Sequence, residues 1–271
     1  MLFRSRSRAW TLLIGLIGWG MVQTPAQALQ FQFVCGVDPS CTSLDSQAYA
    51  GFQAAANRWS SLLFDPITVK LNIGFELMAN TILGEAGSTA NFLSYSSYRN
   101  ALGNDRLSSQ DLQAFSALPS GNSFNLLINR TANSPYGVGN ATAYLDNDGD
   151  ANNLILRLHT ANLKAIGIAP DYDGDTSAID AEISFNNYFS WDFDPSNGIN
   201  GGAYDFVAAA AHEIGHALGF FSGVDILDYN SPYLGNYYRD DQFTFVSPLD
   251  LYRYSAESYA QGRSEEHTSE L

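Results

Sequence analysis

The chain has 271 residues, of which 45% are hydrophobic and 15% are charged. This length and apolar content suffice for one packed domain or two small ones, and they exclude a chain that is disordered throughout. The two cysteines exclude a disulfide-dense scaffold and a four-cysteine zinc module. Asp and Glu number 28 against 13 Lys and Arg, for a net charge of −15. Phosphate backbones repel so acidic a chain, so we exclude nucleic acid as a partner.

The N-terminal residues have the pattern of a secretory signal. A basic segment at residues 4–8 precedes an apolar run at 10–22, and the small-x-small triplet Ala26-Gln27-Ala28 follows. This order predicts a signal peptide over residues 1–28, with an uncleaved membrane anchor as the alternative. We therefore expect a secreted or extracytoplasmic protein whose mature chain starts at Leu29 and contains no membrane span.

The C-terminal segment 263–271 reads RSEEHTSEL. This string is similar to an in-frame translation of a sequencing adapter, and an ordinary polar tail is the alternative. We expect a non-native tail here, so His267 is not counted among the candidate ligands. The domain then spans residues 29–262, and we expect the C-terminal subdomain of the natural protein to be largely missing from it.

The elements of residues 29–262 are predicted from residue spacing. Cys35 and Cys41 come first, and the simplest expectation for two cysteines in an exported protein is one small-loop disulfide. Helices are expected over 46–63, 95–107, 109–118 and 160–166, where apolar residues recur at three- and four-residue steps or helix caps occur. Strands are expected over 67–75, 124–128, 154–158 and 183–185. This order predicts one α/β (α+β) domain with a mixed sheet.

The segment from Asp205 to Gly219, DFVAAAAHEIGHALG, has the residues for metal chemistry. Asp205 is a good N-cap, the alanines favour a helix, and Gly219 is typical of a helix C-terminus. His212 and His216 are four residues apart, so their imidazoles share one helix face and can bind one zinc ion. Glu213 lies beside them and can take a proton from a zinc-activated water without binding the metal. A buried helix with two hydrogen-bonded histidines is the alternative.

This segment also resembles a known group of enzymes. HEIGHALG is similar to the motif H-E-x-x-H-x-x-G-x-x-H/D of the metzincin clan of zinc metalloproteases, and four of its five fixed positions match, at His212, Glu213, His216 and Gly219. With EISFN and WDFDPSNGI upstream, the chain resembles exported bacterial metalloproteases, some of which have a PEP-type sorting tail. The resemblance implies a metzincin-like zincin fold with an active-site helix, in the bacterial envelope or outside the cell.

The resemblance leaves the third zinc ligand open. The family's fifth position falls on Ser222, which is a poor zinc ligand, and no methionine follows Gly219 to form the family's Met-turn. The third ligand is therefore a histidine in the missing C-terminal part, or Asp225 after a longer turn with Asp228 as a weaker variant, or the protein is an inactive relative. We expect His159 at the surface or as a helix cap.

Two acidic turns are candidates for calcium. Residues 146–150 and 171–175 both read D-x-D-G-D, and alternating carboxylates in a turn can converge on this ion. The candidate ligands are Asp146, Asp148 and Asp150 in the first turn, and Asp171, Asp173, Asp175 and Glu182 at the second. Solvated Asp-Gly turns are the alternative. Asp192 and Asp194 are expected to form turns rather than a metal site.

Together these observations predict a secreted zinc endopeptidase, a monomer that acts on protein or peptide substrates. Zinc is the expected cofactor, with calcium as a candidate second ion, and the strand at 183–185 is expected to pair with an extended substrate. Two alternatives stay open. One is a non-catalytic, calcium-dependent extracellular binding protein with a relic zinc motif, and the other is a zinc hydrolase that acts on cell-wall amide bonds.

Overall fold

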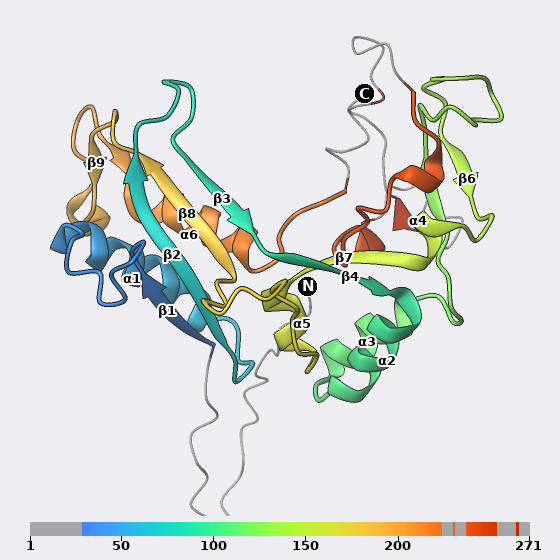
Figure 1. Cartoon of the computed structure of the whole chain (residues 1–271), viewed down its shortest axis with the longest axis horizontal. Coiled ribbons are helices and arrows are strands. Elements are labelled where there is room, and N and C mark those ends of the chain that lie inside the picture. Colours follow the sequence, from blue (N-terminus) through green and yellow to red (C-terminus); the bar gives the residue numbers. More distant parts are fainter. Residues whose placement is uncertain (1–28, 224–229, 231–236, 254–263, 266–271) are drawn as a thin grey trace, which may run out of the picture.

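The structure is a computed structural model, and it describes residues 29–223, 230, 237–253 and 264–265. Its elements form two groups, which are joined where strand β3 leads into strand β4 (Figure 1). Each group has its own cluster of buried hydrophobic side chains.

The first group is built on a four-stranded sheet with the order β1-β2-β8-β3. The strands are β1 (Gln30–Val34), β2 (Thr68–Glu76), β8 (Ala181–Asn186) and β3 (Gly84–Ser88). The first three are parallel, and β3 is antiparallel to β8 at the edge of the sheet. Parallel neighbours need a long connection, and a helix supplies it between β1 and β2.

That helix, α1 (Ser46–Ser60), packs with α6 (Phe206–Ala217) against the sheet. Phe52 of α1, Phe185 of β8 and Phe206 of α6 are 0% exposed. Their ring centroids lie 4.8 to 5.7 Å apart in edge-to-face arrangements. Such aromatic pairs stabilise a core beyond the area that they bury, so α6 is fixed against the sheet along one whole face.

The second group surrounds the antiparallel pair of β4 (Ala90–Ser94) and β7 (Ile155–His159). Its helices are α2 (Tyr95–Asp105), α3 (Ser109–Ala117), α4 (Ala151–Leu154) and α5 (Thr160–Ala165). Three short strands form another sheet, with the order β11 (Ser264–Glu265), β5 (Leu126–Ile128) and β6 (Tyr144–Asp146). β9 (Trp191–Asp192) and β10 (Tyr204–Asp205) pair with each other beside α6, and 3-10 helices occupy 195–197, 240–242 and 250–252.

The mixed α+β class with a mixed sheet, predicted from the sequence, is confirmed, and the predicted helices form with ends within three residues of the expected ones. Cys35 and Cys41 form the expected disulfide. Ser108 caps α3 and shares a capping box with Asp111. The elements that were not predicted are the short helix α4 and strands β1, β3, β4, β6, β9, β10 and β11. β3, with the sequence GEAGS, has no large apolar residue, so nothing in its pattern marks it as a strand.

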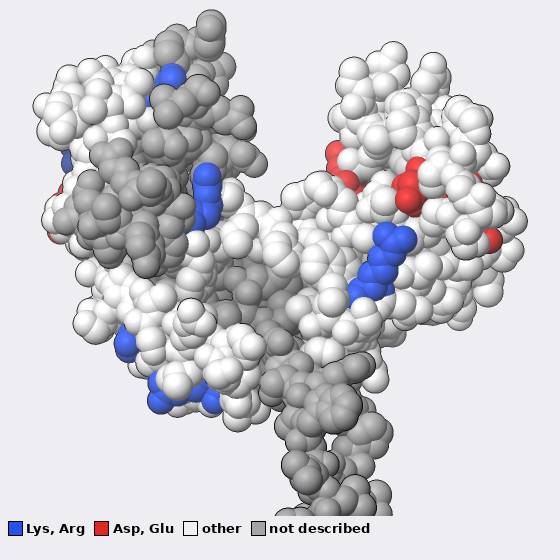
Figure 2. All heavy atoms as spheres, turned by 180° about the vertical axis from the view of Figure 1, so that it is seen from behind, with Lys and Arg blue, Asp and Glu red and all other residues white. Residues whose placement is uncertain are grey.

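Among the described residues, no helix combines the length and the apolar character that crossing a membrane requires. Seen from behind, the surface is hollowed between two lobes, and charged side chains are sparse on it (Figure 2). The described acidic side chains on this face therefore form no continuous patch (Figure 2).

Candidate active site

The helix α6 presents two different faces. The side chain of Asp205 accepts a hydrogen bond from the backbone N–H of Ala208 at 2.9 Å, which satisfies one free donor of the first turn. The apolar residues Phe206, Val207, Ala210, Ile214 and Ala217 are buried in the core. His212, Glu213 and His216 lie outside that stripe and line a common pocket. The 3.6-residue period of the helix thus separates the core face from a face with titratable groups.

The two histidines point to one place. The Nε2 atoms of His212 and His216 lie 3.0 Å apart. His216 donates from Nδ1 to the carbonyl oxygen of Phe220 at 2.8 Å, which leaves Nε2 as the nitrogen of this ring that can bind a metal. Two nitrogens bound to one tetrahedral zinc at about 2.0–2.1 Å lie about 3.3 Å apart, so the pair has the chemistry and nearly the separation of zinc ligands.

Glu213 occupies the pocket next to the imidazoles. Burial raises the pKa of its carboxyl group, and the nearby carboxylate of Glu85 on β3 adds to this shift. His212 and His216 act in the opposite direction and lower that pKa. A half-buried carboxylate with a raised pKa takes up a proton more readily than a solvated one, which suits a general base.

The pocket has a volume of about 670 Å³ and lies where the two groups of elements meet. Its walls come from the edge strand β3, from Arg157 and His159 of β7, from α6, and from Phe221 and Ser222 after the helix. The strand expected to pair with a substrate, β8, lies between β2 and β3 and has both edges occupied, so that prediction was wrong. Among the described strands, β3 is the one that forms the edge of the sheet beside the site.

His159 is neither a surface residue nor a helix cap, contrary to the prediction from the sequence. It is 6% exposed, and its side chain makes no capping hydrogen bond to α5. Its Nδ1 donates to the carbonyl oxygen of His216 at 2.8 Å, and its ring stacks on Phe221 with centroids 4.0 Å apart. Burial lowers its pKa to about 4, so the ring is neutral at pH 7. The alternation along β7, which puts Arg157 and His159 on one face, is the sequence signal for this placement.

The described residues do not supply a third zinc ligand. Among them, no Cys, Asp, Glu or further His brings a ligand atom within 4.8 Å of both imidazoles. The hydroxyl of Ser222, at the family's fifth position, donates to Asp250 and accepts from Arg253 at 3.1 Å. Asp225 and Asp228 lie outside the described residues.

The first acidic turn gathers partners from elsewhere in the chain. Asp146 and Asp148 form one group with Asp240, and Asp150 forms another with Asp240 and Asp241, with ligand atoms within 4.8 Å in each group. Burial raises the pKa of Asp146 to about 6, and the charges of Asp240, Asp148 and Asp150 push in the same direction. The sequence did not reveal Asp240 and Asp241, because about 90 residues separate them from the turn.

The second acidic turn gathers no such partners. Asp171, Asp173 and Asp175 are exposed, and Asp171 and Asp175 accept hydrogen bonds from backbone N–H groups two residues ahead. Glu182 accepts from the amide of Asn72 across the β2–β8 pair. This is the solvated Asp-Gly turn that was the alternative from the sequence, and the four residues do not form a group of ligands.

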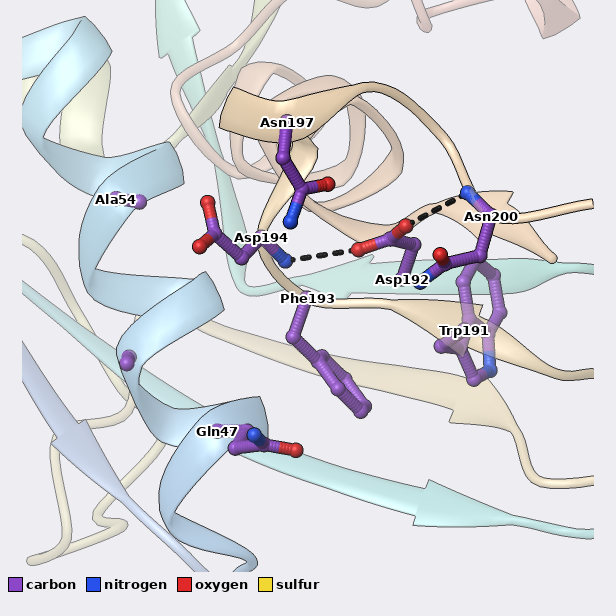
Figure 3. A pocket seen from close by; sticks show the side chains of 9 residues that line it. Gln47, Ala54, Trp191, Asp192, Phe193, Asp194, Asn197 and Asn200 are labelled. Carbon is purple, nitrogen blue, oxygen red and sulfur yellow. Dashed lines mark hydrogen bonds between the residues drawn. The ribbon is translucent and has the colours of Figure 1, made fainter.

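A further pocket of about 610 Å³ lies between α1 and the β9–β10 region (Figure 3). Both carboxylate oxygens of Asp192 accept backbone hydrogen bonds there, from Asp194 at 3.0 Å and from Asn200 at 2.8 Å. Asp194 in turn accepts from the backbone of Ser196 at 3.1 Å. The prediction that Asp192 and Asp194 form turns is confirmed.

The arrangement around α6 offers two aligned imidazoles, a half-buried carboxylate, an edge strand and a pocket large enough for part of a polymer chain. Comparison with known proteins finds no family model, no curated protein and no solved structure that matches this chain.

Proposed function

We propose that the protein is an exported zinc-dependent endopeptidase with a metzincin-like active site. The observation that carries this proposal is the pair of Nε2 atoms of His212 and His216, 3.0 Å apart, above a pocket that also contains Glu213. The same separation is that of an N–H···N hydrogen bond between the two imidazoles, which is the alternative from the sequence, and a zinc titration distinguishes the two.

His212 and His216 would hold the metal. The bond from His216 Nδ1 to the backbone of Phe220 orients that ring, and the bond from His159 to the carbonyl of His216 supports the same turn of the helix. A catalytic zinc takes three protein ligands. The described residues supply two of them, and Asp225, which lies outside those residues, is the candidate that the sequence offers for the third.

Glu213 would act as the general base. When bound, zinc supplies Lewis acidity that polarises a carbonyl group and acidifies water. Glu213 then accepts the proton of the attacking water and passes it to the leaving amine. Its partial burial keeps the carboxylate poorly solvated, so proton uptake is favoured.

The substrate would bind as an extra strand on β3. The segment Gly84–Ser88 forms the edge of the main sheet, and its residues Gly84, Ala86, Gly87 and Ser88 line the pocket beside α6. An extended peptide can hydrogen-bond to such an edge through its main chain. Apart from the exposed Glu85, the side chains of β3 are small and leave room for this approach, which favours a peptide over a cell-wall amide as substrate.

A zinc titration and a substrate panel test the proposal. The full-length natural protein should bind one zinc per chain, lose proteolysis on chelation and regain it when zinc is added. Cleavage of cell-wall amides without cleavage of denatured protein would favour the alternative hydrolase. Zinc binding without any hydrolysis would favour the non-catalytic binding protein.

We also propose that the first acidic turn binds calcium as a structural ion. Five carboxylates approach one another there, and Asp146 and Asp240 are each 2% exposed. Among the described residues, the only ion pair made by the group joins Asp241 to the exposed Arg239, at 3.4 Å. Asn152 is fully buried with Nδ2 on Asp146 at 2.8 Å, and its Oδ1 has no hydrogen-bond partner. Carboxylate and amide oxygens are calcium ligands, and a divalent cation would offset the repulsion.

A further inference from the structure

Strand β7 turns one basic side chain toward the zinc pocket. Leu156 and Leu158 are 0% exposed in the core of the second group of elements. Because side chains alternate along a strand, Arg157 and His159 share the other face, and both line the pocket with His212 and His216. The placement of Arg157 therefore follows from the same alternation that buries its two neighbours.

The guanidinium group of Arg157 lies between aromatic rings. Its Cζ atom is 5.6 Å from the ring centroid of Phe221 and 5.7 Å from that of Phe245. Phe92, which is 58% exposed, lies directly across the β4–β7 pair and contacts Phe245 with centroids 6.3 Å apart. Cation–π contacts of this kind hold the group in place but leave its N–H donors free.

No acidic side chain in the described part of the chain neutralises this group. Among the residues that the structure describes, Arg157 makes neither an ion pair nor a side-chain hydrogen bond. Burial lowers its pKa, which shows that it has lost part of its hydration. A half-buried cation without a counter-ion is unusual in a chain with more than twice as many acidic as basic residues.

The position of Arg157 relative to the imidazoles is fixed. Phe221 stacks on His159 at 4.0 Å, and His159 donates to the carbonyl oxygen of His216 at 2.8 Å. Arg157, Glu213 and the two imidazoles line the same pocket, so a substrate bound beside the imidazoles would lie within reach of the guanidinium group.

We propose that Arg157 binds a carboxylate of the substrate, so that the pocket selects peptides with an acidic group beside the scissile bond. The proposal rests on the proposed endopeptidase function. A guanidinium binds a carboxylate through two parallel hydrogen bonds, and the phenylalanine rings exclude water from them. For an endopeptidase the carboxylate belongs to an Asp or Glu side chain; a carboxylate from the C-terminus of the peptide would instead make the enzyme a carboxypeptidase.

The experiment compares matched peptides on the full-length natural protein. One series has Glu or Gln at each position around the cleaved bond, and a second series has a free or an amidated C-terminus. Charge-assisted hydrogen bonds of this type are worth a factor of about 10 to 100, so the wild type should favour the acidic member of one series by that factor in kcat/KM. The series that responds identifies the source of the carboxylate.

Two variants and a control locate the effect. Arg157→Met keeps the apolar stem and should abolish the preference, so that the ratio of kcat/KM for the Glu and Gln peptides falls to about 1. Arg157→Lys keeps the charge but not the planar fork and should retain a weaker preference. Arg106→Met removes a guanidinium that lies 4.6 Å over Phe115 outside the pocket, and it should change neither value. Equal cleavage of acidic and neutral peptides by the wild type would overturn the proposal, as would an unchanged preference in Arg157→Met.

A binding measurement separates this proposal from the proposed function. In the presence of a chelator, the acidic peptide should bind the wild type more tightly than its neutral partner does, and Arg157→Met should remove the difference. If no peptide is cleaved while this difference persists, the endopeptidase proposal fails and the carboxylate site stands. If peptides are cleaved and the difference is absent, the carboxylate site fails alone.

Discussion

The two candidate metal sites of this protein are assembled in opposite ways. Helix α6 brings His212, Glu213 and His216 together through four-residue spacing within one element. The first acidic turn supplies only part of its group, and Asp240 and Asp241 come from a distant segment of the chain. A local arrangement depends on the formation of one helix, whereas a distant one depends on the packing of the second group of elements.

The second acidic turn completes the comparison. It has the same D-x-D-G-D pattern as the first, yet its carboxylates are exposed and engaged in local turns. No distant carboxylate meets it among the described residues. The pattern supplies candidate ligands, and the tertiary partner decides whether they form a site.

The largest effect is expected from a substitution that removes the general base of the α6 site and keeps the geometry of the site. Glu213→Gln should lower kcat of the full-length natural protein by about 10²–10⁴-fold, because the amide cannot accept the proton of the attacking water. Zinc content, measured by elemental analysis, should stay at the wild-type value because Glu213 is not a ligand. Glu76→Gln, at the exposed end of β2, is the matched control and should be fully active. Undiminished turnover in Glu213→Gln would reject the general-base role.

The second-largest effect is expected from replacement of Asp240, a distant residue that completes the group of carboxylates at the first acidic turn. Saturating calcium, at 100 times Kd, should stabilise the wild type by about 2.7 kcal/mol against unfolding. Asp240→Asn should lose most of this gain, because Asp240 belongs to both groups of carboxylates. Asp240 also accepts hydrogen bonds from Asn133 and, at 2.9 Å, from Tyr144, so the variant should be less stable than the wild type without calcium, and the calcium-induced increase in Tm is the quantity to compare. Thermal melts in zinc-supplemented buffer with and without calcium measure both effects. If calcium does not raise the Tm of the wild type, the proposed calcium site is wrong.

A smaller effect is expected from pH. The pKa of Asp146 is about 6 in the folded protein against an ordinary value of 3.8. A raised pKa means that the stability contributed by this group is present below about pH 4 and is lost as the pH rises through about 6. Calcium competes with the proton for the carboxylate, so the calcium-induced increase in Tm should grow over the same interval. Asp146→Asn should flatten the profile, and a calcium effect independent of pH between 5 and 8 would exclude Asp146 as a ligand.

The contrast between a site formed within one helix and a site assembled from distant segments explains which features could be predicted from the sequence. The helix of residues 205–219, its cap at Asp205 and the common direction of two imidazoles follow from local spacing, and the structure has all three. The position of His159 under the site and the role of β3 as the edge strand depend on which strands become neighbours. Strand β3 has no apolar alternation, and its pairing with β8 is a long-range contact that local pattern does not specify.

The smallest expected effect compares the same position in the two acidic turns. Asp148 and Asp173 are both the exposed middle carboxylate of D-x-D-G-D, but only Asp148 lies in a group with Asp146 and Asp240. Asp148→Asn should reduce the calcium-induced increase in Tm, because it removes one ligand charge from the group. Asp173→Asn should change neither calcium binding nor stability by more than about 0.5 kcal/mol, as for other exposed substitutions. Its backbone has a φ of +53°, and Asn adopts this left-handed conformation as readily as Asp does. Equal responses of the two variants would show that the turns do not differ, and the distant carboxylates would then have no part in calcium binding.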